Sequence, residues 1–116
     1  PDYMQRAARH LASATDIAQA EAVARHAVVL AQSGQTGLMV NIIRESDGPY
    51  RWHCGDIALN DIANKERRVP DDWIDRQNYT LSANALAYLQ PLIAGEISLP
   101  WSAGLPEYPW VEWPAV

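Results

Sequence analysis

The amino-acid sequence predicts an α/β fold, because segments with helical periodicity flank short runs of β-favouring residues. One helical segment follows Ser13 and a second follows Ser82. Between them, two apolar runs begin at Leu38 and Tyr50 and have the length of strands. Since 116 residues suit one domain or one piece of a larger one, we expect helices that pack on a small sheet.

The first helix is expected to begin at Ser13 and to stop at Gly34. Ser13 and Asp16 have the spacing of a capping box, and glycine commonly ends a helix. Between them, apolar residues recur at helical spacing, which predicts a buried, mostly alanine stripe that packs closely on a sheet or another helix. The stripe comprises Ile17, Ala20, Ala24, Ala27, Val28 and Ala31.

The two β runs predict an antiparallel hairpin at a sheet edge. Residues 38–43 are apolar, residues 46–49 break the chain, and apolar and polar side chains alternate from Tyr50 onward. His53 lies on the polar phase with no carboxylate in evident register, so we expect a rim position rather than a catalytic role. Cys54, the single cysteine, cannot form an internal disulfide, and we expect a buried structural thiol in reducing cytoplasm.

The second helix is expected to begin after Ser82 and to end at Gly95. Its apolar stripe comprises Leu86, Leu89, Leu92 and Ile93. Pro91 lies inside this pattern and removes one backbone hydrogen bond, which predicts a kink or a break near Gln90.

The remaining segments are less regular. Between residues 56 and 74 we expect short helical turns, with Asn64 as a candidate cap and Pro70 as the first residue of a new turn. Residues 96–116 are rich in proline and tryptophan, so they cannot continue a helix and are too apolar to remain fully exposed to solvent. We expect this tail to lie extended on a surface of the same or a neighbouring lobe.

Composition and charge exclude several classes of protein. Hydrophobic residues make up 48% and charged residues 20% of the chain, close to the averages for globular proteins. No apolar run approaches the roughly 18–20 residues of a membrane span, and the start lacks the layout of a secretory signal. A net charge of -5 opposes nucleic-acid binding, and three histidines with one cysteine match no zinc-site spacing. We therefore expect no membrane, nucleic-acid or metal ligand role for this chain.

A candidate anion site lies near the first residue. Tyr3 and Arg6 are at positions i and i+3, which share one face of a helical turn. The guanidinium of Arg6 can bind phosphate oxygens bidentately, and the Tyr3 hydroxyl can bond a neighbouring oxygen. These side chains suit a sugar phosphate. An amphipathic turn with a surface arginine is the alternative for these residues taken alone.

Several groups of residues form a longer pattern when they are taken in order. They are Tyr3-Met4-Gln5-Arg6; Ser13 with Asp16; Gly34, Gly37, Met39 and Val40; Asp61-Ile62-Ala63-Asn64-Lys65-Glu66; Pro70 with Ile74; Tyr88-Leu89-Gln90-Pro91-Leu92-Ile93-Ala94-Gly95-Glu96; and Gly104-Leu105-Pro106-Glu107-Tyr108. This pattern spans nearly the whole chain and resembles the C-terminal part of a diphosphate-dependent phosphofructokinase. The segments 61–66 and 88–96 are the most diagnostic.

The resemblance implies part of the smaller, sugar-phosphate-binding lobe of a two-lobed enzyme, with residues 1–95 in the lobe and residues 96–116 as its tail. The intact enzyme would convert fructose 6-phosphate and diphosphate to fructose 1,6-bisphosphate and phosphate, a reaction of glycolysis and gluconeogenesis. By resemblance, Tyr3 and Arg6 contact the 6-phosphate of the sugar. Asp2 stands where the family has glycine, and Arg9 is expected on a solvated helix face.

The resemblance also places catalysis outside this chain. The family keeps its glycine-rich diphosphate site, its catalytic aspartate and its Mg²⁺ ligands in the other lobe, and their motifs do not occur here. We therefore expect no catalytic residue in this segment and no activity from it alone. The expected partners are the N-terminal part of the same enzyme and further copies in a homo-oligomer, in the cytoplasm.

Two alternatives remain at this point. The residues that select the phosphoryl donor lie in the other lobe, so an ATP-dependent phosphofructokinase segment is the near alternative. A noncatalytic protein-interaction module that docks through its tail is the alternative from a different class, because exposed apolar tails often mark interfaces.

Overall fold

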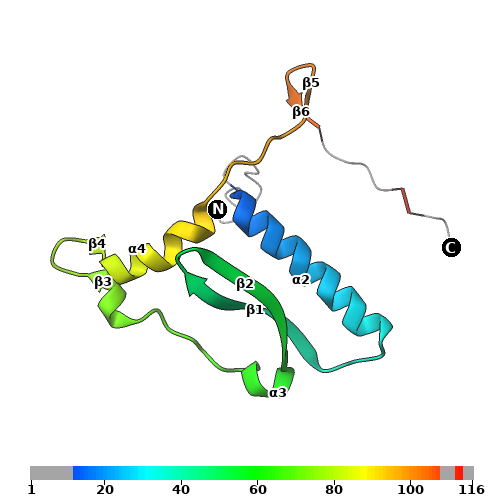
Figure 1. Cartoon of the computed structure of the whole chain (residues 1–116), viewed down its shortest axis with the longest axis horizontal. Coiled ribbons are helices and arrows are strands. Elements are labelled where there is room, and N and C mark those ends of the chain that lie inside the picture. Colours follow the sequence, from blue (N-terminus) through cyan, green and yellow to red (C-terminus); the bar gives the residue numbers. More distant parts are fainter. Residues whose placement is uncertain (1–11, 108–111, 114–116) are drawn as a thin grey trace.

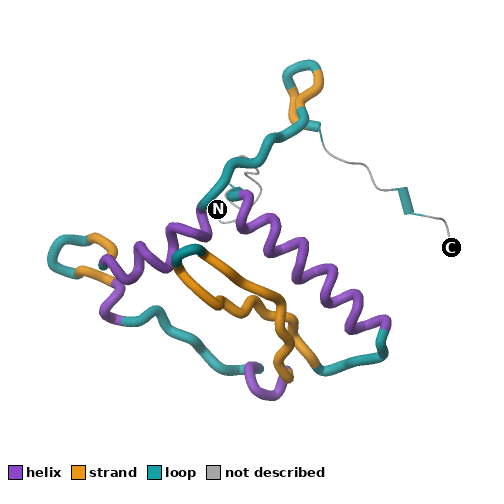
Figure 2. Tube along the Cα trace, in the orientation of Figure 1, coloured by secondary structure: helices purple, strands orange, loops and turns teal. Residues whose placement is uncertain are grey.

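The computed structural model of the chain describes residues 12–107 and 112–113, so Tyr3 and Arg6 lie outside the described residues. A long helix, α2 (Ala14–Gln32), lies beside a hairpin of two strands, β1 (Leu38–Asp47) and β2 (Tyr50–Ala58) (Figure 1). A shorter helix, α4 (Ala83–Leu89), lies at the turn end of this hairpin (Figure 2). The predicted mixture of helices and strands is therefore confirmed.

Several short elements complete the described part of the chain. They are α3 (Leu59–Ile62), the 3-10 helices η2 (Asp71–Trp73) and η3 (Gln90–Ile93), and the strands β3 (Ile74–Asp75), β4 (Thr80–Leu81), β5 (Trp101–Ser102) and β6 (Leu105–Pro106). The strand pairs β1–β2, β3–β4 and β5–β6 form separate antiparallel sheets. The sequence predicted only the first pair, because strands of two residues leave no periodic pattern to detect.

The limits of α2 agree with the sequence prediction. Ser13 is the N-cap, and its Oγ accepts a hydrogen bond from the Asp16 backbone N–H at 3.0 Å. The helix ends at Gln32, and Gly34 follows with a φ of 75°, a left-handed conformation that glycine adopts without steric cost.

The predicted stripe of α2 is not buried by the described residues. All six of its residues are exposed, including Ile17 at 41% and Val28 at 56%. The face that lies against the hairpin carries instead Gln19, which is 5% exposed, and the partly buried Val23 and His26. Both faces of the helix are largely uncharged, so periodicity did not identify the face that packs on the hairpin.

The central hairpin confirms the predicted antiparallel pairing, with longer strands than expected. A bulge between Arg44 and Ser46 shifts the register, and His53 Nδ1 lies 2.7 Å from Glu45 Oε1. His53 is exposed as predicted, but the expectation that it has no carboxylate partner is wrong, because Glu45 lies diagonally across the hairpin from it. Cys54 is only half-buried, which corrects its expected burial, because the described hairpin is a sheet of only two strands.

The second helix also follows its sequence signals. Ser82 caps α4 by accepting a hydrogen bond from the Ala85 N–H at 3.3 Å, and Pro91 falls in η3 directly after α4 ends, which confirms the predicted break. The C-cap of α3 is Ala63, and Asn64 follows it with a φ of 60°, so the predicted cap is shifted by one position. Pro70 is the cap of η2 rather than its first residue, which shifts the prediction by one position.

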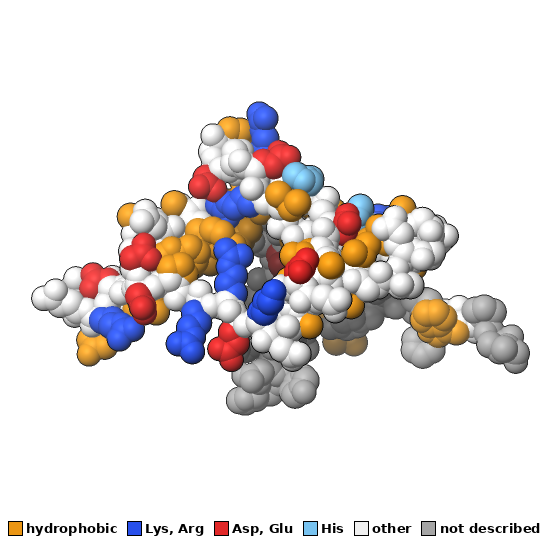
Figure 3. Space-filling model, turned by 90° about the horizontal axis from the view of Figure 1, so that it is seen from below, with side chains coloured by type: hydrophobic (Ala, Val, Ile, Leu, Met, Phe, Trp, Pro, Cys, Tyr) orange, Lys and Arg blue, Asp and Glu red, His pale blue; other side chains and the backbone are white. Residues whose placement is uncertain are grey.

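Little of the described chain is shielded from solvent. Among residues 12–107 and 112–113, the one apolar residue that is buried is Ala85. Hydrophobic side chains lie open between charged ones on the face drawn in Figure 3. In the tail, Trp101 is 61% exposed and Leu105 is 70% exposed, and the hairpin β5–β6 stands away from the other elements (Figure 1). Whether the tail covers a surface therefore stays a prediction.

In the described residues, every helix is too short or too polar to cross a membrane.

Candidate functional site

The start of α2 is tied to the end of η3 by backbone and side-chain hydrogen bonds. The Ala14 N–H donates to Gly95 O at 3.0 Å, and the Thr15 N–H donates to Ala94 O at 3.2 Å. The Ser13 hydroxyl donates to Leu92 O at 2.6 Å while it accepts from the first turn. Because Ser13 is 9% exposed, these bonds are shielded and fix the position at which the chain enters α2.

A hollow of about 620 Å³ adjoins this junction. Its lining comprises Ala12, Ser13, Asp16, Leu92, Ile93, Gly95, Glu96 and Ile97. Among the described residues, this lining contains two carboxylates and no lysine or arginine, so these residues alone repel a phosphate. A phosphate bound nearby would need cations from other residues.

A second hollow, of about 260 Å³, lies between α4 and the segment before η2. Trp73 and Tyr88 contact each other there in a tilted arrangement, with ring centroids 4.9 Å apart and ring planes at 46°, next to Arg67 and Arg68. The Arg68 side chain is 90% exposed, and its Nη2 lies 3.9 Å from Glu66 Oε2. These arginines are solvated, so the hollow lacks the shielded charge of a built anion site.

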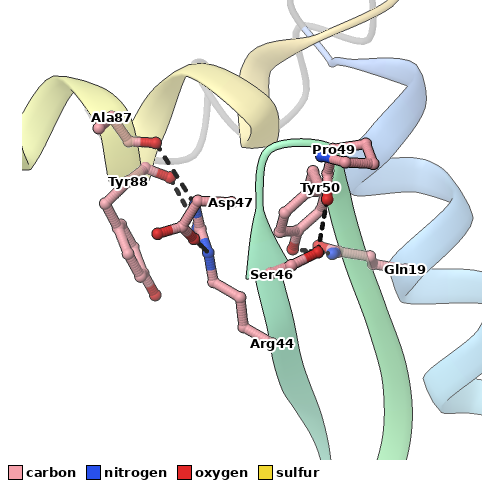
Figure 4. A network of polar contacts seen from close by, with 8 residues as sticks. All are labelled: Gln19, Arg44, Ser46, Asp47, Pro49, Tyr50, Ala87 and Tyr88. Atoms are coloured by element: carbon pink, nitrogen blue, oxygen red, sulfur yellow. Dashed lines mark hydrogen bonds and ion pairs between the residues drawn. The ribbon is translucent and has the colours of Figure 1, made fainter.

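Arg44 joins the hairpin to α4 (Figure 4). Its Nη1 donates to Tyr88 O at 2.8 Å and its Nη2 donates to Ala87 O at 3.4 Å, near the C-terminal end of the helix. The guanidinium carbon also lies 4.8 Å from the ring centroid of Tyr50 and 4.4 Å from that of Tyr88, and Asp47 completes an ion pair. A cation near the last helical carbonyls complements the helix dipole, so Arg44 has a structural role.

Tyr50 connects this cluster to α2. The Gln19 side-chain amide donates to the Tyr50 hydroxyl at 2.6 Å, so α2 and α4 are both held to the turn end of the hairpin (Figure 4). Sequence reasoning did not identify Arg44 or Gln19. No local signal could have predicted the contacts between elements, because the Tyr50 hydroxyl bound by Gln19 and the α4 carbonyls bound by Arg44 lie 31 to 44 positions away in the chain.

The titratable side chains of the described residues do not gather into a metal site. No group of three or more His, Cys, Asp or Glu side chains that could hold a metal ion occurs in residues 12–107 and 112–113. The pKa of Asp75 is lowered from its usual value, because its carboxylate accepts hydrogen bonds from the Asn78 side chain and from the backbone N–H groups of Asn78 and Gln77. These bonds close the turn between β3 and β4.

The sequence-predicted site residues are not tested by this geometry, because Tyr3 and Arg6 lie outside the described residues. What the structure describes is the fixed junction that follows them in the chain, at Ser13. Their role in binding a sugar phosphate stays a prediction.

Comparison with known proteins gives a consistent result, although no family model matches the chain. The chain is 43% identical over 107 residues to a pyrophosphate--fructose 6-phosphate 1-phosphotransferase of Methylococcus capsulatus, covering 92% of this chain and 26% of that protein. It is 47% identical over 106 residues to the protein of the same name from Halomonas elongata, covering 91% of this chain and 25% of the relative.

Solved structures agree with the sequence relatives. The backbone matches a pyrophosphate-dependent phosphofructokinase from Marinobacter aquaeolei with a TM-score of 0.85 and 46% identity, over 91% of this chain and 27% of that one. The corresponding enzyme from Nitrosospira multiformis matches with a TM-score of 0.85 and 42% identity, over 92% and 27% of the two chains. The chain thus spans about a quarter of the length of these relatives. In sequence and in backbone fold, the chain corresponds to a segment of the pyrophosphate-dependent phosphofructokinases.

Proposed function

We propose that the chain is the C-terminal segment of a longer enzyme that transfers a phosphoryl group from diphosphate to fructose 6-phosphate. The products are fructose 1,6-bisphosphate and phosphate. The observation that carries this proposal is identity of 43–47% over more than 90% of the chain to relatives named for this reaction. These names favour diphosphate over ATP as the donor, and they favour an enzyme over a noncatalytic interaction module.

Within this enzyme, the segment forms part of the smaller lobe and holds the acceptor sugar by its phosphate. Tyr3 and Arg6 are the proposed contacts of the 6-phosphate, since a guanidinium and a phenol offer the donors that its oxygens accept. The junction at Ser13 supports this role, because a binding group needs a fixed attachment to a rigid element. Contacts to the 6-phosphate, far from the reacting hydroxyl, orient the sugar but take no direct part in forming or breaking bonds.

Catalysis is proposed to reside in the rest of the enzyme. Mg²⁺, which would neutralise charge on the transferred phosphoryl group, is proposed to be held by the other lobe, as the resemblance to the family implies. The remaining part of the polypeptide and further copies of it are the proposed partners, and the cytoplasm is the proposed location.

The test is steady-state kinetics of the intact polypeptide with fructose 6-phosphate, diphosphate and Mg²⁺. A charge-assisted phosphate contact is worth about 1.5–3 kcal/mol, so Arg6→Ala should raise the KM for fructose 6-phosphate by about one to two orders of magnitude. Arg9→Ala is the matched control and should change this constant little. An unchanged constant in the Arg6 variant removes the site assignment, and turnover with ATP but not with diphosphate overturns the donor.

A further inference from the structure

The outer face of α2 is a continuous apolar stripe that no described element covers. We call it the outer stripe, and it comprises Ile17, Ala20, Ala24, Ala27, Val28 and Ala31, all exposed. At about 100° per residue these side chains fall within an arc of roughly 100° on the side opposite Gln19 and His26. Figure 1 shows the hairpin along one side of α2 and no other element along its length on the opposite side.

The composition of this arc is not that of a solvent-facing helix surface. The charged residues of α2, Asp16, Glu21 and Arg25, stand at the edges of the stripe or beyond it. A helix face that stays in water carries polar and charged side chains, whereas an uncharged apolar stripe is typical of a face that packs on a neighbouring element. The sequence of α2 is therefore suited to contact on two faces, and the described residues supply contact on one.

The size of the side chains indicates what the outer stripe contacts. Four of its six residues are alanine, which lets a neighbouring backbone approach closely and offers no polar group to bond. The occupant that fits is a flat apolar surface whose own hydrogen bonds are satisfied internally, such as the face of a sheet or of another helix.

We propose that the outer stripe packs against the remaining part of the same polypeptide, and this rests on the proposed function above. The curated relatives are about three and a half times as long as this chain, and the solved structure from Marinobacter aquaeolei shares its backbone with a TM-score of 0.85, so most of the polypeptide that could cover the stripe lies outside this chain. A second copy is the poorer occupant, because a stable interface uses about 20–30 residues a side. Six mostly small side chains on one helix fall well short of that.

Cysteine labelling of the intact polypeptide tests the proposal without a disruptive substitution. Ala24 lies in the middle of the outer stripe. Ala18 is also an exposed alanine of α2, but it lies outside the stripe. The proposal predicts that a thiol reagent modifies Ala24→Cys at least about tenfold more slowly than Ala18→Cys in the folded protein. Labelling of the unmodified protein gives the background, and labelling in denaturant should be equal for the two variants.

A pair of charge substitutions provides a second measurement. Ala24→Glu and Ala18→Glu each place a carboxylate three positions from Glu21, so their effects within the helix are matched. Ala24→Glu should lower the melting temperature of the intact protein by several degrees or abolish its solubility, because it buries an unpaired charge, while Ala18→Glu should have little effect.

The outcomes separate this proposal from the proposed function. Equal labelling of the two cysteine variants at all protein concentrations overturns the proposal, and protection of Ala24→Cys that is lost on dilution assigns the stripe to a second copy and also overturns it. Turnover of fructose 6-phosphate and diphosphate is measured on the same preparations. If the enzyme is active but Ala24→Cys is labelled as fast as Ala18→Cys, only the proposed packing of the outer stripe is refuted. If Ala24→Cys is protected but the protein lacks this activity, only the proposed function is refuted.

Discussion

At the scale of single residues, Arg44 has the largest set of contacts among the cations of the described chain. Its side chain is 17% exposed and combines hydrogen bonds to two carbonyls at the end of α4, an ion pair with Asp47 and contacts with two aromatic rings. A lysine could keep the charge, but it lacks the planar fork that reaches several partners at once. The arginine is therefore needed for its shape as well as its charge.

Arg44→Lys should lower the free energy of unfolding of the intact polypeptide by about 1–3 kcal/mol, since it leaves partly shielded carbonyls without their donor. Denaturant unfolding measures this change. Arg51→Lys, an exposed arginine in the same hairpin, is the control and should stay within about 0.5 kcal/mol of the unmodified protein. Equal effects of the two substitutions would show that the contacts of Arg44 do not stabilise the fold.

At the scale of elements, the junction of α2 with η3 depends on Gly95. Its φ is 81°, and a Cβ built on it would lie 2.7 Å from the Cβ of Ala14, closer than side chains approach in proteins. The Gly95 carbonyl accepts the hydrogen bond from the Ala14 N–H. The glycine therefore satisfies two conditions, a left-handed backbone and a close approach to the start of the helix.

Gly95→Ala should destabilise the intact polypeptide by about 2–4 kcal/mol, because the strain of a left-handed alanine adds to an overpacked contact. Gly34→Ala separates the two causes, since Gly34 has a φ of 75° and no atom near its added Cβ. It should cost about 1 kcal/mol. Thermal or denaturant unfolding compares them, and a Gly34 variant as unstable as the Gly95 variant would rule out the steric contact.

At the scale of the whole molecule, the chain is more open than an independent domain of its length. Its Cα radius of gyration is 18.2 Å, whereas about 13 Å is expected for 116 residues. With one buried apolar residue in the described part, its hydrophobic burial is too small to offset the conformational entropy of folding. The described arrangement is therefore expected to depend on contacts with more of the polypeptide.

The isolated chain of 116 residues should unfold without a cooperative thermal transition and should bind a hydrophobic dye, because its apolar surface is open to solvent. Calorimetry and dye fluorescence measure both properties, with the intact polypeptide as the control that shows a transition and little dye binding. A sharp calorimetric transition of the isolated chain would contradict this expectation.

The sequence by itself determined the local features of this protein and its relationship to other proteins. Ser13 and Ser82 marked the starts of α2 and α4, Pro91 marked the break after α4, and alternation marked the central hairpin, because caps, proline and periodicity act within a few residues. The order of the motifs indicated the phosphofructokinase family, with which the relatives agree.

Only the tertiary structure decided which side of α2 meets the hairpin and where Arg44 is bound. The periodic pattern of α2 marks a stripe that lies on the face away from the hairpin, so the pattern does not say which neighbour covers which face. The α4 carbonyls that accept hydrogen bonds from Arg44 lie 43 and 44 positions along the chain, and Glu45 meets His53 beside a bulge that no local signal predicted. Contacts of this kind depend on the path of the backbone between their partners, which short-range sequence patterns do not encode.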